Sequence, residues 1–132
     1  MTWPALSLAD AHARLTAPGS PFEITDALVD GRTMRVWKHA PATLREVFVA
    51  ARAAHGPKDF LVYEGERASF EAFARATLAL AGHLAAQGVA QGDRVAVAMR
   101  NLPEWPVAAW AAVLLGAILT PINAWGTGPE LA

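Results

Sequence analysis

The chain has 132 residues, enough for one domain that buries about two thirds of the surface of its unfolded form. Apolar residues make up 54% of the sequence and charged residues 17%, and the net charge is -1, so nothing indicates binding to nucleic acid or to an anionic membrane. The absence of cysteine excludes disulfides, a thiolate nucleophile and thiolate metal ligands. The first fifteen residues lack the pattern of a secretory signal, and we expect a cytoplasmic protein.

Residues 1–42 are expected to form an N-terminal arm of short elements. Ser7 resembles the N-cap of a helix over residues 8–16. Residues 22–24 and 33–37 are extended candidates on either side of a hairpin-type turn at Asp30-Gly31.

The aromatic residues of the arm are Trp3, Phe22 and Trp37. They carry more apolar surface than so short a segment buries by itself, so the arm is expected to dock on another surface. The main expectation is the chain's own core, and the alternative is a partner chain, which would make a homodimer through the arm.

Residues 43–132 are expected to form an incomplete α/β subdomain. Thr43 is placed to cap a helix to about residue 54, with Leu44, Val47, Phe48 and Ala51 on one face. A small hairpin follows, in which a type II′ turn at Gly65-Glu66 would place Glu64 opposite Arg67.

A long helix over residues 70–87 comes next, capped by Ser69. Gly88 and Val89 predict a Schellman ending, because glycine enters the left-handed conformation at little cost. The expected core stripe recurs at helical spacing and consists of Phe70, Phe73, Thr77, Leu80 and Leu84.

The last part predicts a parallel β-α-β unit with strands at residues 93–99 and 117–121. The first strand has valines on one face and alanines on the other, and the alanine face would let a helix approach closely. Asn101 is expected to cap the intervening helix, with Glu104 three residues later. Pro106 favours an alternative, an irregular first turn with the regular helix starting near Trp105.

Residues 105–129 carry no charge, which raises the alternative of a membrane span. Proline or glycine interrupts the run at residues 106, 116, 121 and 126, and no lysine or arginine follows it. A helix and a short buried strand are therefore preferred, and no transmembrane span is expected.

Residues 60–125 resemble the N-terminal part of AMP-forming acyl-CoA synthetases, within the superfamily of adenylate-forming ligases. The features that match are Ser69-Phe70, Gly88-Val89, Gly92-Asp93-Arg94-Val95, residues 101–105, Gly116-Ala117 and Pro121-Ile122-Asn123. Residues 36–48 and 127–131 are similar to medium- or long-chain fatty-acyl ligases. The resemblance implies the N-terminal portion of the large domain of these enzymes.

For the full-length family the resemblance implies a two-step reaction. A carboxylate attacks the α-phosphate of ATP, with Mg²⁺, to give an acyl adenylate and pyrophosphate, and coenzyme A then displaces AMP. The fatty acid is expected as a substrate of the full-length enzyme only. The matching glycines and prolines of this chain have structural causes and perform no chemistry.

The catalytic motifs of that family are missing from these 132 residues. The phosphate loop that is rich in serine, threonine and glycine and ends in Pro-Lys-Gly does not occur. Residues 126–129 imitate it without the lysine, and Thr127 with Glu130 is better explained as the capping box of a new helix. Because the chain ends at Ala132, inside the first turn of that helix, we expect an N-terminal fragment that is inactive alone.

No catalytic, cofactor-binding or metal-binding residue is therefore predicted in this chain. His12, His39, His55 and His83 lack metal-ligand spacing. Asn101 follows a parallel strand and begins a helix, where α/β proteins bind anions, but capping is the preferred explanation. The alternative function is a stand-alone dimerisation or interaction module derived from such a ligase.

Overall fold

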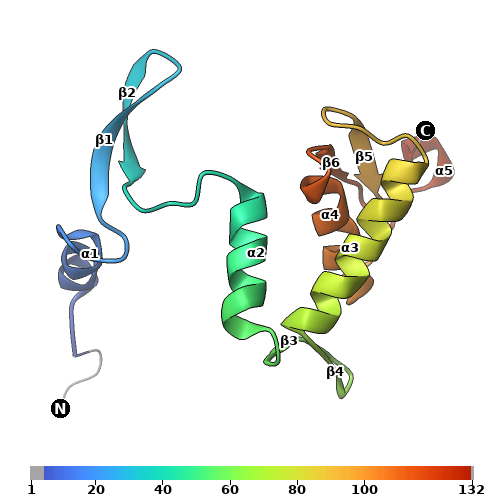
Figure 1. Ribbon diagram of the computed structural model, residues 1–132, viewed down its shortest axis with the longest axis horizontal. Helices are drawn as coiled ribbons and strands as arrows, with labels where there is room; N and C mark the ends of the chain where they lie inside the picture. Colours follow the sequence, from blue (N-terminus) through green and yellow to red (C-terminus); the bar gives the residue numbers. More distant parts are fainter. Residues whose placement is uncertain (1–4, 132) are drawn as a thin grey trace. The chain divides into compact units, whose positions relative to one another are not determined.

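The computed structural model describes residues 5–131, so Trp3 lies outside the described residues. The chain divides into two compact units, Met1–Ala42 and Thr43–Ala132 (Figure 1). Among the described residues of the first unit, none is buried.

The first unit contains one helix and one antiparallel ribbon. Helix α1 spans Leu8–Thr16, and Ser7 caps it as predicted, since its Oγ accepts the N–H of Asp10 at 3.1 Å. Strand β1 (Ile24–Val29) pairs with β2 (Arg32–Trp37) from Val29–Arg32 to Ile24–Trp37.

The expected first strand, residues 22–24, was therefore misplaced. Asp30 and Gly31 have φ values of 47° and 77°. Positive φ at both central residues defines a type I′ turn, whose twist lets pairing begin immediately beside the two-residue loop. The strand therefore extends up to the turn.

In the second unit, helix α2 spans Leu44–His55, and Thr43 caps it by accepting the N–H of Glu46 at 3.2 Å. Only Phe48 of this helix is buried. Leu44 and Val47, expected on the same buried face, are 58% and 39% exposed. One aromatic side chain thus provides most of the apolar attachment of α2.

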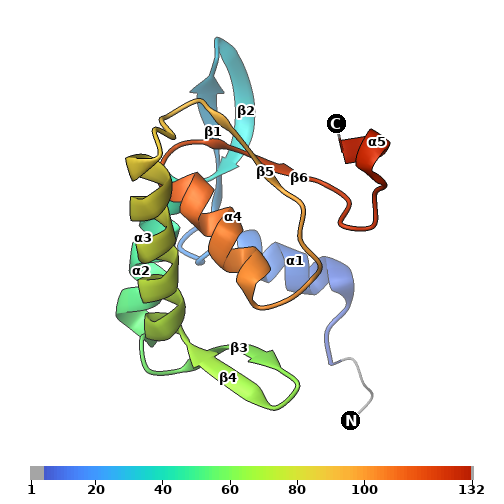
Figure 2. The same ribbon diagram turned by 90° about the vertical axis from the view of Figure 1, so that its right-hand side faces the viewer.

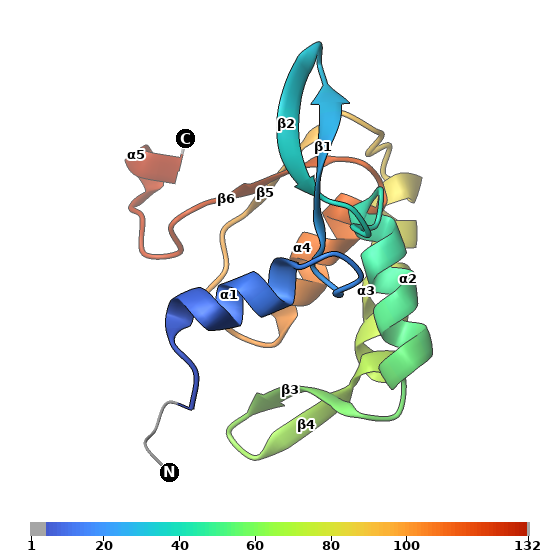
Figure 3. The ribbon, with the colours of Figure 1, turned by 90° about the vertical axis from the view of Figure 1, so that its left-hand side faces the viewer.

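A hairpin runs from the end of α2 to the start of α3 (Figure 3). Strands β3 (Asp59–Tyr63) and β4 (Glu66–Ser69) pair with Tyr63 opposite Glu66, and Val62, not Glu64, lies opposite Arg67. The turn is Glu64-Gly65, with φ values of 45° and 89°, so it is type I′. The expected type II′ turn one residue later is wrong, and Arg67 pairs instead with Asp59 at 2.6 Å.

Helix α3 spans Phe70–Ala86, and the Oγ of Ser69 accepts the N–H of Ala72 at 3.1 Å. Its Schellman ending is confirmed. The N–H of Val89 donates to the carbonyl of Leu84 at 3.1 Å, and Gly88 has φ of 94°.

The buried face of α3 differs from the expected stripe: it consists of Phe73, Ala74, Thr77 and Ala81, whereas Leu80 and Leu84 are partly exposed. Helix α4 (Glu104–Leu114) lies beside α3 (Figure 2) and buries Ala109, Ala111 and Ala112. Small side chains on both helices let the two backbones pack closely, which explains why alanines replace leucines in this interface.

Strands β5 (Arg94–Val97) and β6 (Ile118–Pro121) pair in parallel, in register from Arg94–Ile118 to Val97–Pro121, and α4 packs on both. This confirms the β-α-β unit. Strand β5 is shorter than the expected strand over residues 93–99. The expectation that a helix covers the alanine face is wrong, because Ala96 and Ala98 are exposed while Val97 is buried. Helix α5 (Gly128–Leu131) ends the described chain.

Candidate functional site at the carboxyl edge of the parallel strands

Two segments leave the small parallel sheet at the same edge, residues 98–103 after β5 and residues 122–127 after β6. Open α/β sheets bind ligands outside the carboxyl ends of their strands. We define the carboxyl-edge group as Arg100, Asn101, Asn123 and Trp125, the residues before Thr127 in these segments whose side chains offer hydrogen bonds, charge or an aromatic face.

Asn101 does not cap α4, so that prediction is wrong. The N-cap is Pro103, with no side-chain hydrogen bond, and the helix begins at Glu104. Pro106 is then the third helical residue, where an intrahelical N–H donor is not required. The alternative, an irregular first turn followed by a helix beginning near Trp105, is confirmed.

Asn101 is exposed and borders a shallow hollow of about 210 Å³ with Tyr63 and Pro103. The nearby helix end is unsuited to an anion. Glu104 already places a carboxylate in the first turn, and Pro106 removes one N–H donor.

Asn123 shapes the other segment. Its Oδ1 accepts the N–H of Trp125 at 3.0 Å, and its carbonyl accepts the N–H of Gly126 at 3.0 Å. These bonds form an Asx-type turn that orients Trp125. The guanidinium of Arg100 lies 4.8 Å from the centre of the Trp125 ring, a cation–π distance.

The Arg100–Trp125 contact was missed in the sequence. The contact could have been predicted once the two strands were recognised as parallel. Arg100 follows the end of β5 at Val97, and Trp125 follows the end of β6 at Pro121, by similar numbers of residues. The contact holds the two segments together. Nothing in the carboxyl-edge group supplies a nucleophile, a general base or a carboxylate for a metal.

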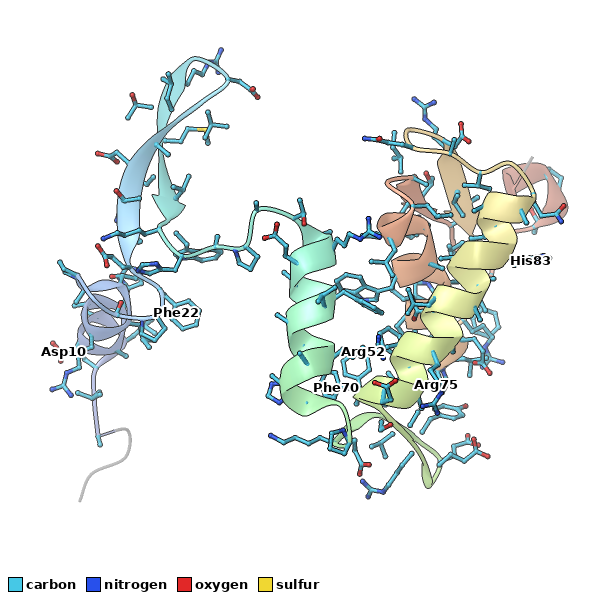
Figure 4. All side chains as sticks on the ribbon, in the orientation of Figure 1. Asp10, Phe22, Arg52, Phe70, Arg75 and His83 are labelled. Atoms are coloured by element: carbon cyan, nitrogen blue, oxygen red, sulfur yellow. The ribbon has the colours of Figure 1, made fainter. Side chains whose placement is uncertain are left out.

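The histidines form no centre. Among residues 5–131, no group of three histidine, cysteine, aspartate or glutamate side chains is placed to hold a metal ion. His39 lies 3.6 Å from Glu23, whose pKa is lowered chiefly by the hydrogen bond from Lys38. The ring of His55 contacts that of Phe70 at 5.4 Å, and His83 is exposed on α3 (Figure 4).

The segment that imitates a phosphate loop leads into a helix. Helix α5 begins at Gly128, directly after Thr127. In the described part of the chain, no helix is both long and apolar enough to cross a membrane.

The fold is that of the N-terminal subdomain of adenylate-forming enzymes. NpsA of Klebsiella oxytoca, solved with 3-hydroxyanthranilyl-AMSN, superposes with a TM-score of 0.65 at 20% identity, covering 68% of this chain and 18% of that one. O-succinylbenzoate coenzyme A synthetase of Bacillus subtilis, solved with AMP, superposes with a TM-score of 0.58 at 26% identity. The match covers 61% of this chain and 21% of that synthetase.

Residues 48–132 match the family described as AMP-binding enzyme, and the chain belongs to that family. A curated relative, a probable CoA ligase of Humulus lupulus, is 34% identical over 86 residues, or 64% of this chain. The chain spans 16% of the length of that relative.

Proposed function

We propose that this chain is the N-terminal part of an acyl-CoA synthetase, which activates a carboxylic acid with ATP and transfers it to coenzyme A. The family match over residues 48–132 carries the proposal. The identity to a probable CoA ligase supports the ligase class. The β5–α4–β6 unit supports it further, because it supplies the same fold.

In this proposal the chain contributes framework and the chemistry belongs to other parts of the enzyme. ATP, Mg²⁺ and coenzyme A bind there, because these 132 residues contain no loop that ends in Pro-Lys-Gly. The residues that resemble the family each have a structural task, such as the helix ending at Gly88. The cellular location we propose is the cytoplasm.

The acid we propose is a fatty acid, on the similarity of residues 36–48 and 127–131 to fatty-acyl ligases. The structural relatives carry names of aromatic acids, O-succinylbenzoate and 3-hydroxyanthranilate derivatives. An enzyme containing this chain should therefore be compared on fatty acids of several lengths and on benzoate-type acids. Preference for the aromatic acids would contradict the fatty-acid assignment.

Pyrophosphate release tests the framework role. The isolated chain, with ATP, Mg²⁺ and either class of acid, is expected to release no more pyrophosphate than a control without protein. Release above that control would contradict the proposal that the catalytic residues lie elsewhere.

A second candidate is a dimerisation or interaction module that uses the N-terminal arm. It is favoured by the exposure of Leu28 at 75%, Trp37 at 61% and Met34 at 51% on the β1–β2 ribbon. Sedimentation over a range of concentrations discriminates the two, since a module would dimerise or bind a full-length ligase. A monomer at every concentration that binds no ligase would contradict the second candidate.

A further inference from the structure

An apolar cavity of about 160 Å³ lies in the second unit, away from the carboxyl-edge group. Four elements line it: α2, β3, α3 and α4. Figure 4 labels Arg52 of α2 and Phe70 of α3, which both border the cavity. We call it the α2 cavity.

Aromatic rings form most of its wall. The ring centroid of Phe48 lies 6.0 Å from that of Phe73 and 5.5 Å from that of Trp110. The ring centroid of Phe60 lies 4.6 Å from that of Phe73 and 4.4 Å from that of Phe70. All four pairs are tilted by 41° to 53°. Tilted rings at such distances make favourable aromatic contacts, and a further ring in the cavity would make contacts of the same kind.

The space exists because small residues stand where α2 faces α3. Ala51 and Ala74 both line the cavity and leave it unfilled, and Phe48 is the buried side chain of α2. An apolar cavity of about 150 Å³ is large enough to hold one benzene ring. The α2 cavity therefore has the volume of a single six-membered ring.

The charges at its border exclude an ionic occupant. The Nε and Nη2 of Arg52 donate to the two carboxylate oxygens of Glu71 at 2.8 and 3.0 Å. This pair is bidentate and electrically neutral, so Arg52 offers little net attraction to an anion. Arg75, 3.9 Å from Glu71, is a second cation near the pair, but it does not line the cavity. The remaining wall is almost entirely apolar, which penalises any buried charge.

We propose that the α2 cavity binds one neutral, single-ring aromatic molecule, inserted between α2 and α3. The ring would complete the aromatic cluster of Phe48, Phe60 and Phe73. It would also strengthen the attachment of α2, since binding to the folded state adds to its stability. This proposal is independent of the proposed ligase function.

Fluorobenzene is the probe that tests it, added to the 132-residue chain and followed by fluorine NMR. The folded chain should show saturable binding, with intermolecular NOEs from the probe to Phe73 and the methyl groups of Val47. Hexane and benzoate are the comparison probes, and both are expected to bind more weakly than fluorobenzene. A folded chain with no saturable binding, or tighter binding of benzoate, would overturn the proposal.

The matched variants are Ala51→Leu, which fills the cavity, and Ala53→Leu, the same change at an exposed site of α2. Ala51→Leu should weaken fluorobenzene binding by about tenfold or more, because the leucine methyls occupy the volume of the ring. Ala53→Leu should leave it unchanged. Equal fluorobenzene binding by the two variants would show that the probe binds outside the α2 cavity and would overturn the proposal. If Ala51→Leu fails to fold, the NOEs between fluorobenzene and the unaltered chain show whether the probe lies in the cavity.

Discussion

Thr77 is the one fully buried polar side chain among the described residues, and its Oγ1 has no hydrogen-bond partner there. It lies on the face of α3 that also buries Ala74 and Ala81. A buried hydroxyl without a partner has lost its bonds to water and gained nothing in return.

Thr77→Val should therefore stabilise the chain by about 1 kcal/mol, since valine keeps the shape and removes the unpaired hydroxyl. Thermal unfolding measures this change. Thr77→Ser is the control, because it keeps the hydroxyl, removes the methyl group and should lower Tm. A lower Tm for Thr77→Val would show that the hydroxyl is satisfied.

Glu71 links stability to pH. Its pKa is lowered from the ordinary value of 4.5, chiefly by the hydrogen bond from Arg52. A carboxylate with a lowered pKa stabilises the folded chain above the unfolded pKa, and the contribution is lost as the pH falls through the folded value.

The difference in Tm between the unaltered chain and Glu71→Gln should therefore be largest above pH 4.5 and should disappear in more acidic solution. Glu66→Gln is the matched control, since Glu66 makes no ion pair among the described residues. A difference for Glu71→Gln that does not change with pH would contradict this account.

The attachment of α2 to the second unit depends on Phe48, which is 7% exposed and packs on Phe73 and Trp110. Phe48→Ala should cost about 3 kcal/mol or more. Hydrogen exchange should increase first in α2, while the amides of α3 and α4 stay protected. Val49→Ala, at a 58% exposed position of the same helix, is the control. Uniform loss of protection in all three helices would contradict a locally attached α2.

The β3–β4 turn stores strain at Glu64, a non-glycine residue with φ of 45°. Glu64→Asn would create the Asn-Gly pair that type I′ turns favour, and it should stabilise the chain by about 0.5–1 kcal/mol. Glu64→Gln removes the same charge without relieving the backbone and should change Tm little. If both variants have the same Tm, charge and not conformation governs this turn.

The elements whose ends depend on local chemistry were predictable from the sequence. Three helices have an N-cap side chain that accepts the backbone N–H of the residue three positions later: Ser7, Thr43 and Ser69. Helix α3 ends at Gly88 because this glycine adopts a positive φ. The turn beside Gly65 was not predictable from the sequence, because glycine fits both the first and the second central position of a two-residue turn. The pairing of Tyr63 with Glu66 is what places Gly65 at the second position.

Features set by tertiary contacts also escaped prediction. The expected core of α3 favoured leucines, whereas the close approach of α4 selects alanines. The Arg100–Trp125 contact joins segments that are neighbours only after two strands have paired.

Residues 43–131 hold the family fold, and residues 5–42 form a separate unit. The first unit lacks buried residues among those described, and the second has its buried residues on α2, α3, β5 and α4 and at Ala117. At the carboxyl-edge group of the second unit, Arg100 contacts the ring of Trp125, and Asn123 accepts a hydrogen bond from the N–H of Trp125.

We propose that the family portion of this chain, residues 48–132, serves as framework in an adenylate-forming ligase. A chimera tests this role: the 86 matching residues of the Humulus lupulus ligase are replaced by their counterparts from this chain. The framework account predicts that the folded chimera still releases pyrophosphate and forms the coenzyme A thioester with the acids of the unmodified ligase. A chimera that folds with the circular dichroism and Tm of the unmodified ligase, yet forms no acyl adenylate, would contradict the claim.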